Sequence, residues 1–198
     1  MALNALPDAI HPQQAIAQSI ASKTTIIPNF LIYQNSTYGI SIQYPAGWTV
    51  NKTNNSSDNN SSPINNIVWF YPQHDAASVS ISIDFPDPRV TNDLTTYLNF
   101  AASSLSQGSL DERFNVIKSS TTKLGGLPAY SLEYSSTNAE DNTTYVTLEL
   151  GTIISGKVLI IDYTANSPSF DKFLPTAFDM INSMSINKSA IEHLTFNL

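Results

Sequence analysis

The stretch Tyr38–Val50, YGISIQYPAGWTV, carries the densest structural signal in the chain. Ile40, Ile42 and Tyr44 alternate with polar residues, and this period of two predicts a strand that buries one face. The YPAG at its end predicts a type I turn, since proline presets the backbone angle at the second position and glycine suits the fourth. Trp48 then begins a short strand, WTV, and we expect its ring to pack under the corner. The stretch is therefore interpreted as a structural corner rather than the lip of a binding site.

Runs of apolar residues on both sides of this corner predict further strands. FLIYQ precedes it, and NIVWFYP and SVSISIDF follow it. In SVSISIDF the apolar Val79, Ile81 and Ile83 are expected to face the core, and Asp84 and the serines to face the other way. FNVIKSSTTKLGG, LPAYSLEYSS, TYVTLELGTII and KVLIIDYTA predict four more strands with short turns between them. VLIIDY is almost entirely apolar, which is typical of a central strand covered on both faces.

Two amphipathic helices complete the predicted fold. An apolar stripe predicts one helix over residues 91–107, and a second stripe predicts another over 169–184, with Pro175 either kinking it or starting its main part. Short turns between consecutive strands require antiparallel pairing. The expected fold class is therefore α+β: an α-β-α sandwich around a central antiparallel sheet.

The composition narrows the classes of function. The chain has 198 residues, a net charge of -7 and no cysteine, which excludes disulfides, thiol catalysis and cysteine metal sites. Without a basic patch, we expect no nucleic-acid partner. Only 13% of the residues are charged, so much of the polar surface must be Asn, Ser and Thr. That composition favours an extracellular or cell-surface location. No run of residues is long enough to cross a bilayer, and no signal peptide follows Met1, so an exported chain would have had its leader removed.

The chain divides into three parts. Residues 1–29 are expected to form an N-terminal extension, in which residues 12–23 allow only a marginal helix. Residues 30–186 are expected to form the domain, and residues 187–198 a C-terminal tail. The oligomeric state is left open by the sequence.

Several Asn residues match the acceptor pattern for N-glycosylation, and many of them crowd into the polar loop NKTNNSSDNNSS. The candidates are Asn35, Asn51, Asn54, Asn55, Asn59, Asn60, Asn142 and Asn187. Chance matches are the alternative explanation, because a chain rich in Asn and Ser produces them freely.

One set of side chains could bind a divalent cation. His74 stands in a predicted turn, and Asp84 and Asp87 lie close together in DFPDP at the following strand end. Hard cations such as Ca²⁺ take oxygen ligands from loops of this kind. Against this, His74 and Asp87 would be ordinary turn residues and Asp84 a solvent-facing strand residue. No cofactor other than such a cation is expected.

The sequence also carries a family resemblance. FLIYQNSTYGISIQYPAGWTV, TTKLGGLPAYSLEYS and FDKFLPTAFDMINSMSI, in this order and spacing, resemble a PsbP-like domain over residues 30–186. The closest resemblance is to the secreted PsbP-like proteins of archaea. The resemblance implies an α-β-α sandwich. The founding members of the family are extrinsic subunits of photosystem II that support retention of calcium and chloride, and regulators that bind the Ran GTPase share the fold.

Three functions are compatible with these observations. The favoured one is a non-catalytic extracellular module that binds a protein partner or stabilises an envelope assembly, because no catalytic motif such as G-x-S-x-G occurs. It could associate with a membrane surface peripherally. The second is a small-ligand or divalent-cation-binding protein. The third, a hydrolase, would need a pocket with two facing acids, at least one with a perturbed pKa.

Overall fold

The computed structural model describes residues 27–53, 64–106 and 112–195. The marginal helix predicted over residues 12–23 lies outside this part of the chain. So do most of the polar loop and the candidate acceptors Asn54, Asn55, Asn59 and Asn60.

The fold is built on a seven-stranded antiparallel sheet with the strand order β3-β4-β5-β9-β8-β7-β6. Its strands are β3 (Thr49–Lys52), β4 (Ile64–Tyr71), β5 (Ala77–Asp84), β6 (Glu112–Leu124), β7 (Leu127–Asn138), β8 (Thr144–Ile154) and β9 (Lys157–Asn166). A smaller sheet, in the order β1-β2-β10, consists of β1 (Phe30–Asn35), β2 (Ile40–Pro45) and β10 (Ser185–Ile186). The two sheets are joined in sequence at the corner between β2 and β3.

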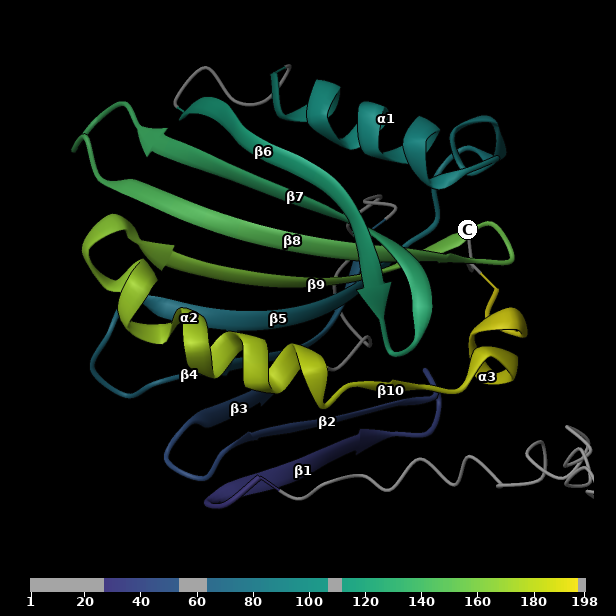
Figure 1. Cartoon of the computed structure of the whole chain (residues 1–198), viewed down its shortest axis with the longest axis horizontal. Coiled ribbons are helices and arrows are strands. Elements are labelled where there is room, and N and C mark those ends of the chain that lie inside the picture. The colour runs from purple at the N-terminus through teal and green to yellow at the C-terminus, as the bar shows by residue number, and fades with distance from the viewer. Residues whose placement is uncertain (1–26, 54–63, 107–111, 196–198) are drawn as a thin grey trace, which may run out of the picture.

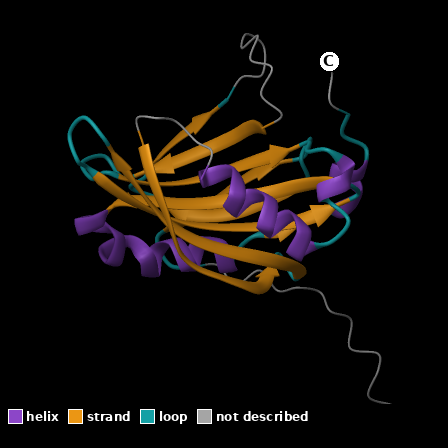
Figure 2. Ribbon diagram, turned by 90° about the horizontal axis from the view of Figure 1, so that it is seen from above, coloured by secondary structure: helices purple, strands orange, loops and turns teal. Residues whose placement is uncertain are grey.

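Helices cover both faces of the large sheet (Figures 1 and 2). They are α1 (Leu94–Ser106), α2 (Ser167–Asn182) and the short α3 (Lys188–Glu192), and a 3-10 turn, η1 (Pro88–Val90), precedes α1. α1 contacts β6 and β7, whereas α2 contacts β2, β5, β8 and β9. The predicted α+β sandwich around an antiparallel sheet is confirmed.

β9 lies at the centre of the large sheet, between β5 and β8. Its Leu159, Ile161 and Tyr163 point into the main core, and its Val158 and Ile160 point into a second core beneath α1. The prediction that VLIIDY is covered on both faces is therefore confirmed.

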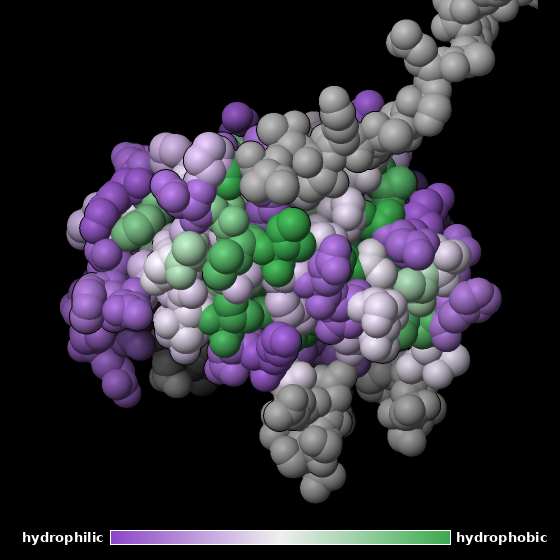
Figure 3. Space-filling model, turned by 90° about the horizontal axis from the view of Figure 1, so that it is seen from below, coloured by the Kyte–Doolittle hydropathy of each residue, from purple (hydrophilic) through white to green (hydrophobic). Residues whose placement is uncertain are grey.

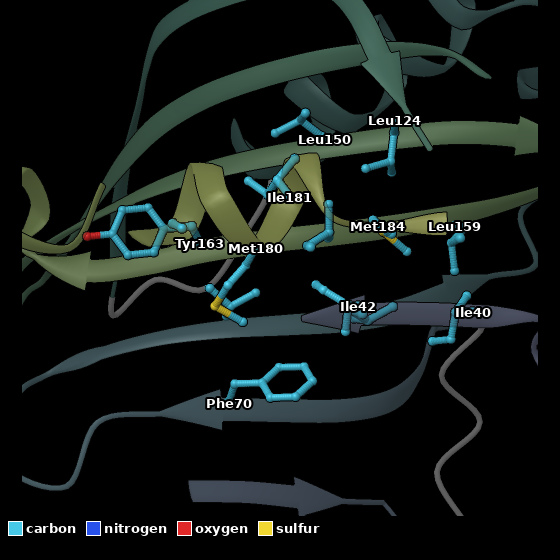
Figure 4. Close-up of a cluster of buried hydrophobic side chains, with 14 of the residues drawn as sticks. Ile40, Ile42, Phe70, Leu124, Leu150, Leu159, Tyr163, Met180, Ile181 and Met184 are labelled. Carbon is cyan, nitrogen blue, oxygen red and sulfur yellow. The ribbon is translucent and has the colours of Figure 1, made fainter. Parts of the chain in front are cut away.

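The main core lies between the large sheet, α2 and the small sheet (Figure 4). Met180 and Ile181 of α2 meet Ile42 of β2 and Phe70 of β4 there. Asn166 caps the start of α2 by accepting from the Ser169 amide at 3.2 Å. The helix begins at Ser167 and contains Pro175 in its interior, so this proline does not start the main helix.

The corner that follows β2 forms one residue later than predicted. The Trp48 amide donates to the Pro45 carbonyl at 2.9 Å, so the turn spans Pro45–Trp48. The reason is the pairing with β1, which continues to Phe30 opposite Pro45 and keeps Tyr44 in the strand. Trp48 packs edge-on against Phe173 of α2, with ring centroids 6.0 Å apart. The corner is structural, as expected.

Residues after the predicted domain boundary also pack on the domain. The Asn187 amide donates to the Gly39 carbonyl at 2.7 Å, and Ile191 of α3 is completely buried. Gly39 has a φ of 61°, and a Cβ there would overlap the Asn187 carbonyl. This close approach requires glycine and seats the start of α3 against the β1–β2 turn.

Candidate functional site

The three residues predicted to bind a cation are placed in different surroundings. Asp84 ends β5 and is only 4% exposed, with its Oδ2 accepting from the Tyr97 hydroxyl at 2.7 Å. Asp87 is exposed and accepts from both the Nε and Nη2 atoms of Arg89, at 2.9 and 2.6 Å. These hydrogen bonds lower the pKa of Asp87 to about 2.

His74 lies at the other end of β5, where its side chain is exposed in the turn before the strand. An eight-residue strand spans roughly 25 Å, so His74 and Asp84 cannot share one ion. In the described residues, no group of three His, Asp or Glu side chains is arranged to hold a metal. The structure therefore does not bring the predicted cation ligands together.

Asp84 instead belongs to a cluster of acids and tyrosines on the α1 side of the sheet, in which Asp84 and both tyrosines are buried and Glu149 and Asp162 are half-buried. Glu149 of β8 lies directly opposite Asp162 of β9, and Asp84 ends the next strand, β5. The Tyr130 hydroxyl of β7 donates to Glu149 Oε1 at 2.5 Å. We call Asp84, Tyr97, Tyr130, Glu149 and Asp162 the acid–tyrosine cluster.

The two tyrosines lie against each other, and each donates a hydrogen bond to one of the carboxyl groups. Tyr97 of α1 is 3% exposed and Tyr130 is fully buried, and their ring centroids lie 5.5 Å apart. Tyr130 lies across Gly151, its neighbour on β8, where a Cβ would overlap the tyrosine ring. Gly151 therefore provides the space that positions the Tyr130 hydroxyl over Glu149.

The carboxyl groups of the cluster lack enough hydrogen-bond donors. The Oδ1 atoms of Asp84 and Asp162 are both buried and have no hydrogen-bond partner. Burial raises the pKa of Asp84, Glu149 and Asp162, and the Asp84 charge raises that of Glu149 further. Glu149 in turn raises the pKa of Asp162. Because Glu149 and Asp162 face each other and cannot both ionise cheaply away from water, the arrangement favours retention of a proton.

Burial also raises the pKa of the two tyrosines, and the neighbouring carboxylates raise it further. Both hydroxyls therefore stay protonated and act as donors to Asp84 and Glu149. The cluster can store a proton, and its two tyrosines supply donors to Asp84 and Glu149. Two facing acids, which a hydrolase would need, are present in Glu149 and Asp162, and both are half-buried.

Sequence reasoning included Asp84 but missed its partners. The missed signal is an acid within an apolar run. Asp162 lies on the same face of its strand as Val158 and Ile160, and the strand is predicted to be covered on both faces. An acid at such a position must be at least partly buried, and a carboxyl group taken out of water needs a partner. Nothing in the sequence indicated that Glu149 would lie opposite it.

Addition of Ca²⁺, Mn²⁺, Zn²⁺ or Cu²⁺ after chelation is expected to leave the thermal unfolding midpoint within about 1 °C, because the predicted ligands are separated. Thermal unfolding followed by circular dichroism measures this. A rise of roughly 5–10 °C with one ion would contradict the expectation, since this is the shift produced by a ligand at a hundred times its Kd. Loss of that rise in Asp162→Asn would then assign the ion to the acid–tyrosine cluster.

A second feature lies on the small sheet, at the opposite side of the molecule from α1 (Figure 1). Leu31 and Ile32 of β1 are 49% and 48% exposed. Figure 3, which views this side, shows apolar side chains gathered near the middle of the face. An open groove of about 390 Å³ lies beside them, lined by Gln34, Asn35, Ser36, Gly39, Ile40, Ser41, Ser185, Ile186 and Asn187. Its side chains are all uncharged.

The described glycosylation candidates differ in accessibility. Asn51, Asn142 and Asn187 are exposed. Asn35 is half-buried, and its side chain donates to the Tyr33 hydroxyl and accepts from the Tyr38 amide, at 3.3 and 3.2 Å. A glycan on Asn35 would replace the first of these contacts.

The fold can be compared with solved structures. No family model matches the chain, and no curated protein matches its sequence. The solution structure of cyanobacterial PsbP (CyanoP) from Synechocystis sp. PCC 6803 is similar, with a TM-score of 0.59 and 19% identity over 82% of this chain and 95% of that one. This chain has a PsbP-like fold. The resemblance drawn from the sequence is thereby confirmed at the level of the fold, whereas similarity to archaeal members stays a prediction.

Two further structures share this PsbP-like fold. LpqN of Mycobacterium tuberculosis, described as involved in cell envelope biogenesis, has a TM-score of 0.52 and 18% identity over 75% of this chain and 83% of that one. A mutant of the protein Mog1 has a TM-score of 0.52 and 10% identity over 83% of this chain and 99% of that one. At these identities the likeness establishes the fold alone. Among the described helices, none is long and apolar enough to cross a membrane.

Proposed function

We propose that this PsbP-like chain is a non-catalytic extracellular or cell-surface module that binds a protein partner through the edge of its small sheet. The observation that carries the proposal is the exposure of two consecutive apolar side chains of β1, Leu31 and Ile32, at 49% and 48%, one on each face of the small sheet. Large apolar side chains left exposed close together at one edge of a protein are typical of interaction sites. An unpaired strand edge next to them offers backbone hydrogen bonds to an incoming strand.

Two other considerations support this function over catalysis and over an intracellular location. In the described part of the chain, the facing acids Glu149 and Asp162 are half-buried, and Glu149 is already engaged by the Tyr130 hydroxyl. The surface is poor in charge, and LpqN, which shares the fold, is described as acting in cell envelope biogenesis. That description supports an envelope setting for this chain by analogy of fold.

A photo-reactive amino acid at Ile32 is expected to crosslink one envelope protein, at close to one copy per chain, when the full chain is added to an envelope fraction of its source organism. The matched control carries the same group at Ile117, which is 51% exposed on the distant strand β6. Mass spectrometry identifies the product. Equal labelling from both positions, or none from Ile32, would contradict the proposal.

Hydrolysis of a substrate by the purified chain would also contradict it, if Glu149→Gln and Asp162→Asn each abolish that activity while the chain stays folded. That result would move the function to the acid–tyrosine cluster.

A further inference from the structure

The outer edge of β1 is an exposed strand edge whose backbone groups have no neighbouring strand in the described part of the chain. In the described part of the chain β1 pairs only with β2, which leaves the backbone groups along its other side without a strand partner. β1 is also the outermost strand on its side of the molecule (Figure 1). An unpaired edge of this kind is a template for pairing with another chain.

The other long edge of the fold is protected against such pairing. β6 carries Lys118 and Lys123 on its exposed length, and its register shifts at a bulge between Val116 and Lys118. Edge lysines and bulges are devices that prevent strands from joining edge to edge. The edge strand β3 has only four residues and ends in Lys52, so it offers little to pair with.

β1 carries none of these devices. Its sequence, FLIYQN, has no charged residue and no proline. Its register with β2 is unbroken from Phe30 opposite Pro45 to Asn35 opposite Ile40. One edge is therefore protected and the other is left regular, apolar and exposed. This contrast indicates that pairing at β1 serves the protein.

The distribution of charge in the chain indicates which kind of partner would pair with the edge of β1. Two copies of a chain with a net charge of -7 repel each other, so they approach most readily where the surface is neutral. From Thr24 to Asn51 the sequence contains no charged residue. The described residues of this stretch include the whole of β1 and β2. Such a surface gives a strongly charged partner nothing to pair with.

We propose that a second copy of this chain occupies the edge of β1, so that the two small sheets join into one continuous antiparallel sheet across a twofold axis. An antiparallel pair of identical strands is self-complementary, as a twofold interface requires. With the twofold axis at Ile32, it would place Ile32 opposite the Ile32 of the second copy and Leu31 opposite its Tyr33, so that both exposed side chains gain a neighbour across the pair. This inference rests on the proposed function, because it names the occupant of the same surface.

The purified 198-residue chain is expected to pass from its monomer mass of 21.6 kDa to twice that mass between roughly 1 and 300 µM. Sedimentation equilibrium measures the change. Ile32→Lys should weaken the association at least about tenfold, because it places a charge at the centre of the pair. Ile117→Lys, on an equally exposed residue of β6, should leave it unchanged. Thermal unfolding of both variants shows whether they are folded.

A covalent test uses the absence of cysteine from the chain. A single Ile32→Cys substitution can form a disulfide only between copies, and facing residues of an antiparallel pair lie within disulfide reach. We expect rapid dimer formation on oxidation of this variant and little with Ile117→Cys.

A chain that stays monomeric at the highest concentration, or that dimerises equally well with Ile32→Lys, would overturn the inference. The proposed function would still stand if Ile32 then crosslinks a different envelope protein. It would fall as well if Ile32 crosslinks nothing, so the two failures are distinguishable.

Discussion

Asn in place of Asp162 is expected to raise the free energy of unfolding at pH 8 by about 2 kcal/mol, the scale of a buried polar group without a partner. Asp162 faces Glu149 across β8 and β9, and its buried Oδ1 accepts no hydrogen bond. At pH 8 the wild-type chain must either ionise the Asp162 carboxyl away from water or keep it protonated at a pH well above its ordinary pKa, and both cost free energy. The amide needs neither, and its NH₂ group can donate to Glu149.

The sign of the pH dependence follows from the raised pKa. Burial lifts the pKa of Asp162 in the folded chain well above its ordinary value, so the folded state binds this proton more tightly than the unfolded state. Its contribution to stability is fully present below about pH 4, the unfolded pKa, and is lost as the pH rises through the folded pKa. Asp162→Asn should therefore match the wild-type chain near pH 4 and exceed it increasingly above that.

Urea unfolding between pH 4 and pH 9 measures the effect. The matched control is Asp179→Asn, which removes the same charge from an exposed position on α2 and accounts for the change in net charge. An Asp162→Asn chain that is less stable than wild type at pH 8 would contradict the prediction. It would show that the carboxylate is stabilised by a partner such as a bound cation.

Alanine in place of Gly151 is expected to lower the free energy of unfolding by about 3 kcal/mol, at the upper end for overpacking a core. A Cβ at this position would overlap the ring and hydroxyl of Tyr130. The tyrosine is fully buried and held by its hydrogen bond to Glu149, with Tyr97 against it. It cannot move aside without leaving Glu149 without a donor.

Gly47→Ala is the matched control, since a Cβ there has no atom within 4 Å and the residue lies in the exposed corner after β2. Unfolding in urea measures both variants. Tyr130→Leu combined with Gly151→Ala should cost less than the sum of the single changes, because the smaller side chain relieves the overlap. If Gly151→Ala and Gly47→Ala have equal effects, the Tyr130 ring repacks freely and the proposed role of Gly151 is wrong.

The sequence and the structure agree on the longer strands and the two main helices, and they differ at the corner, at β10 and α3, and at Asp84, which was expected to face solvent and is buried. The alternation in Ile40, Ile42 and Tyr44 predicts β2 correctly, because a strand with one buried face must alternate. The local pattern predicts the turn one residue too early, since the pairing of Phe30 with Pro45 extends the strand. That pairing depends on a second strand, and a local turn pattern contains no information on it.

The separate small sheet could not be predicted. β10 has only two residues and pairs Ser185 with Ser41, which lie far apart in the sequence. Two residues carry no measurable periodicity, so this strand exists only because α2 delivers the chain to the edge of β2.

By itself, the sequence determined the strands, the two main helices, the burial of β9 on both faces and the neutral character of β1. These depend on the order of apolar and polar residues, which any local conformation must accommodate. Only the tertiary structure decided that Asp84 lies with Glu149 and Asp162, rather than with His74 and Asp87. The acids come from three different strands, and the order and register of strands in a sheet are set by packing of the whole chain. The same packing leaves β1 at an edge, where its neutral sequence becomes a surface that a second chain can pair with.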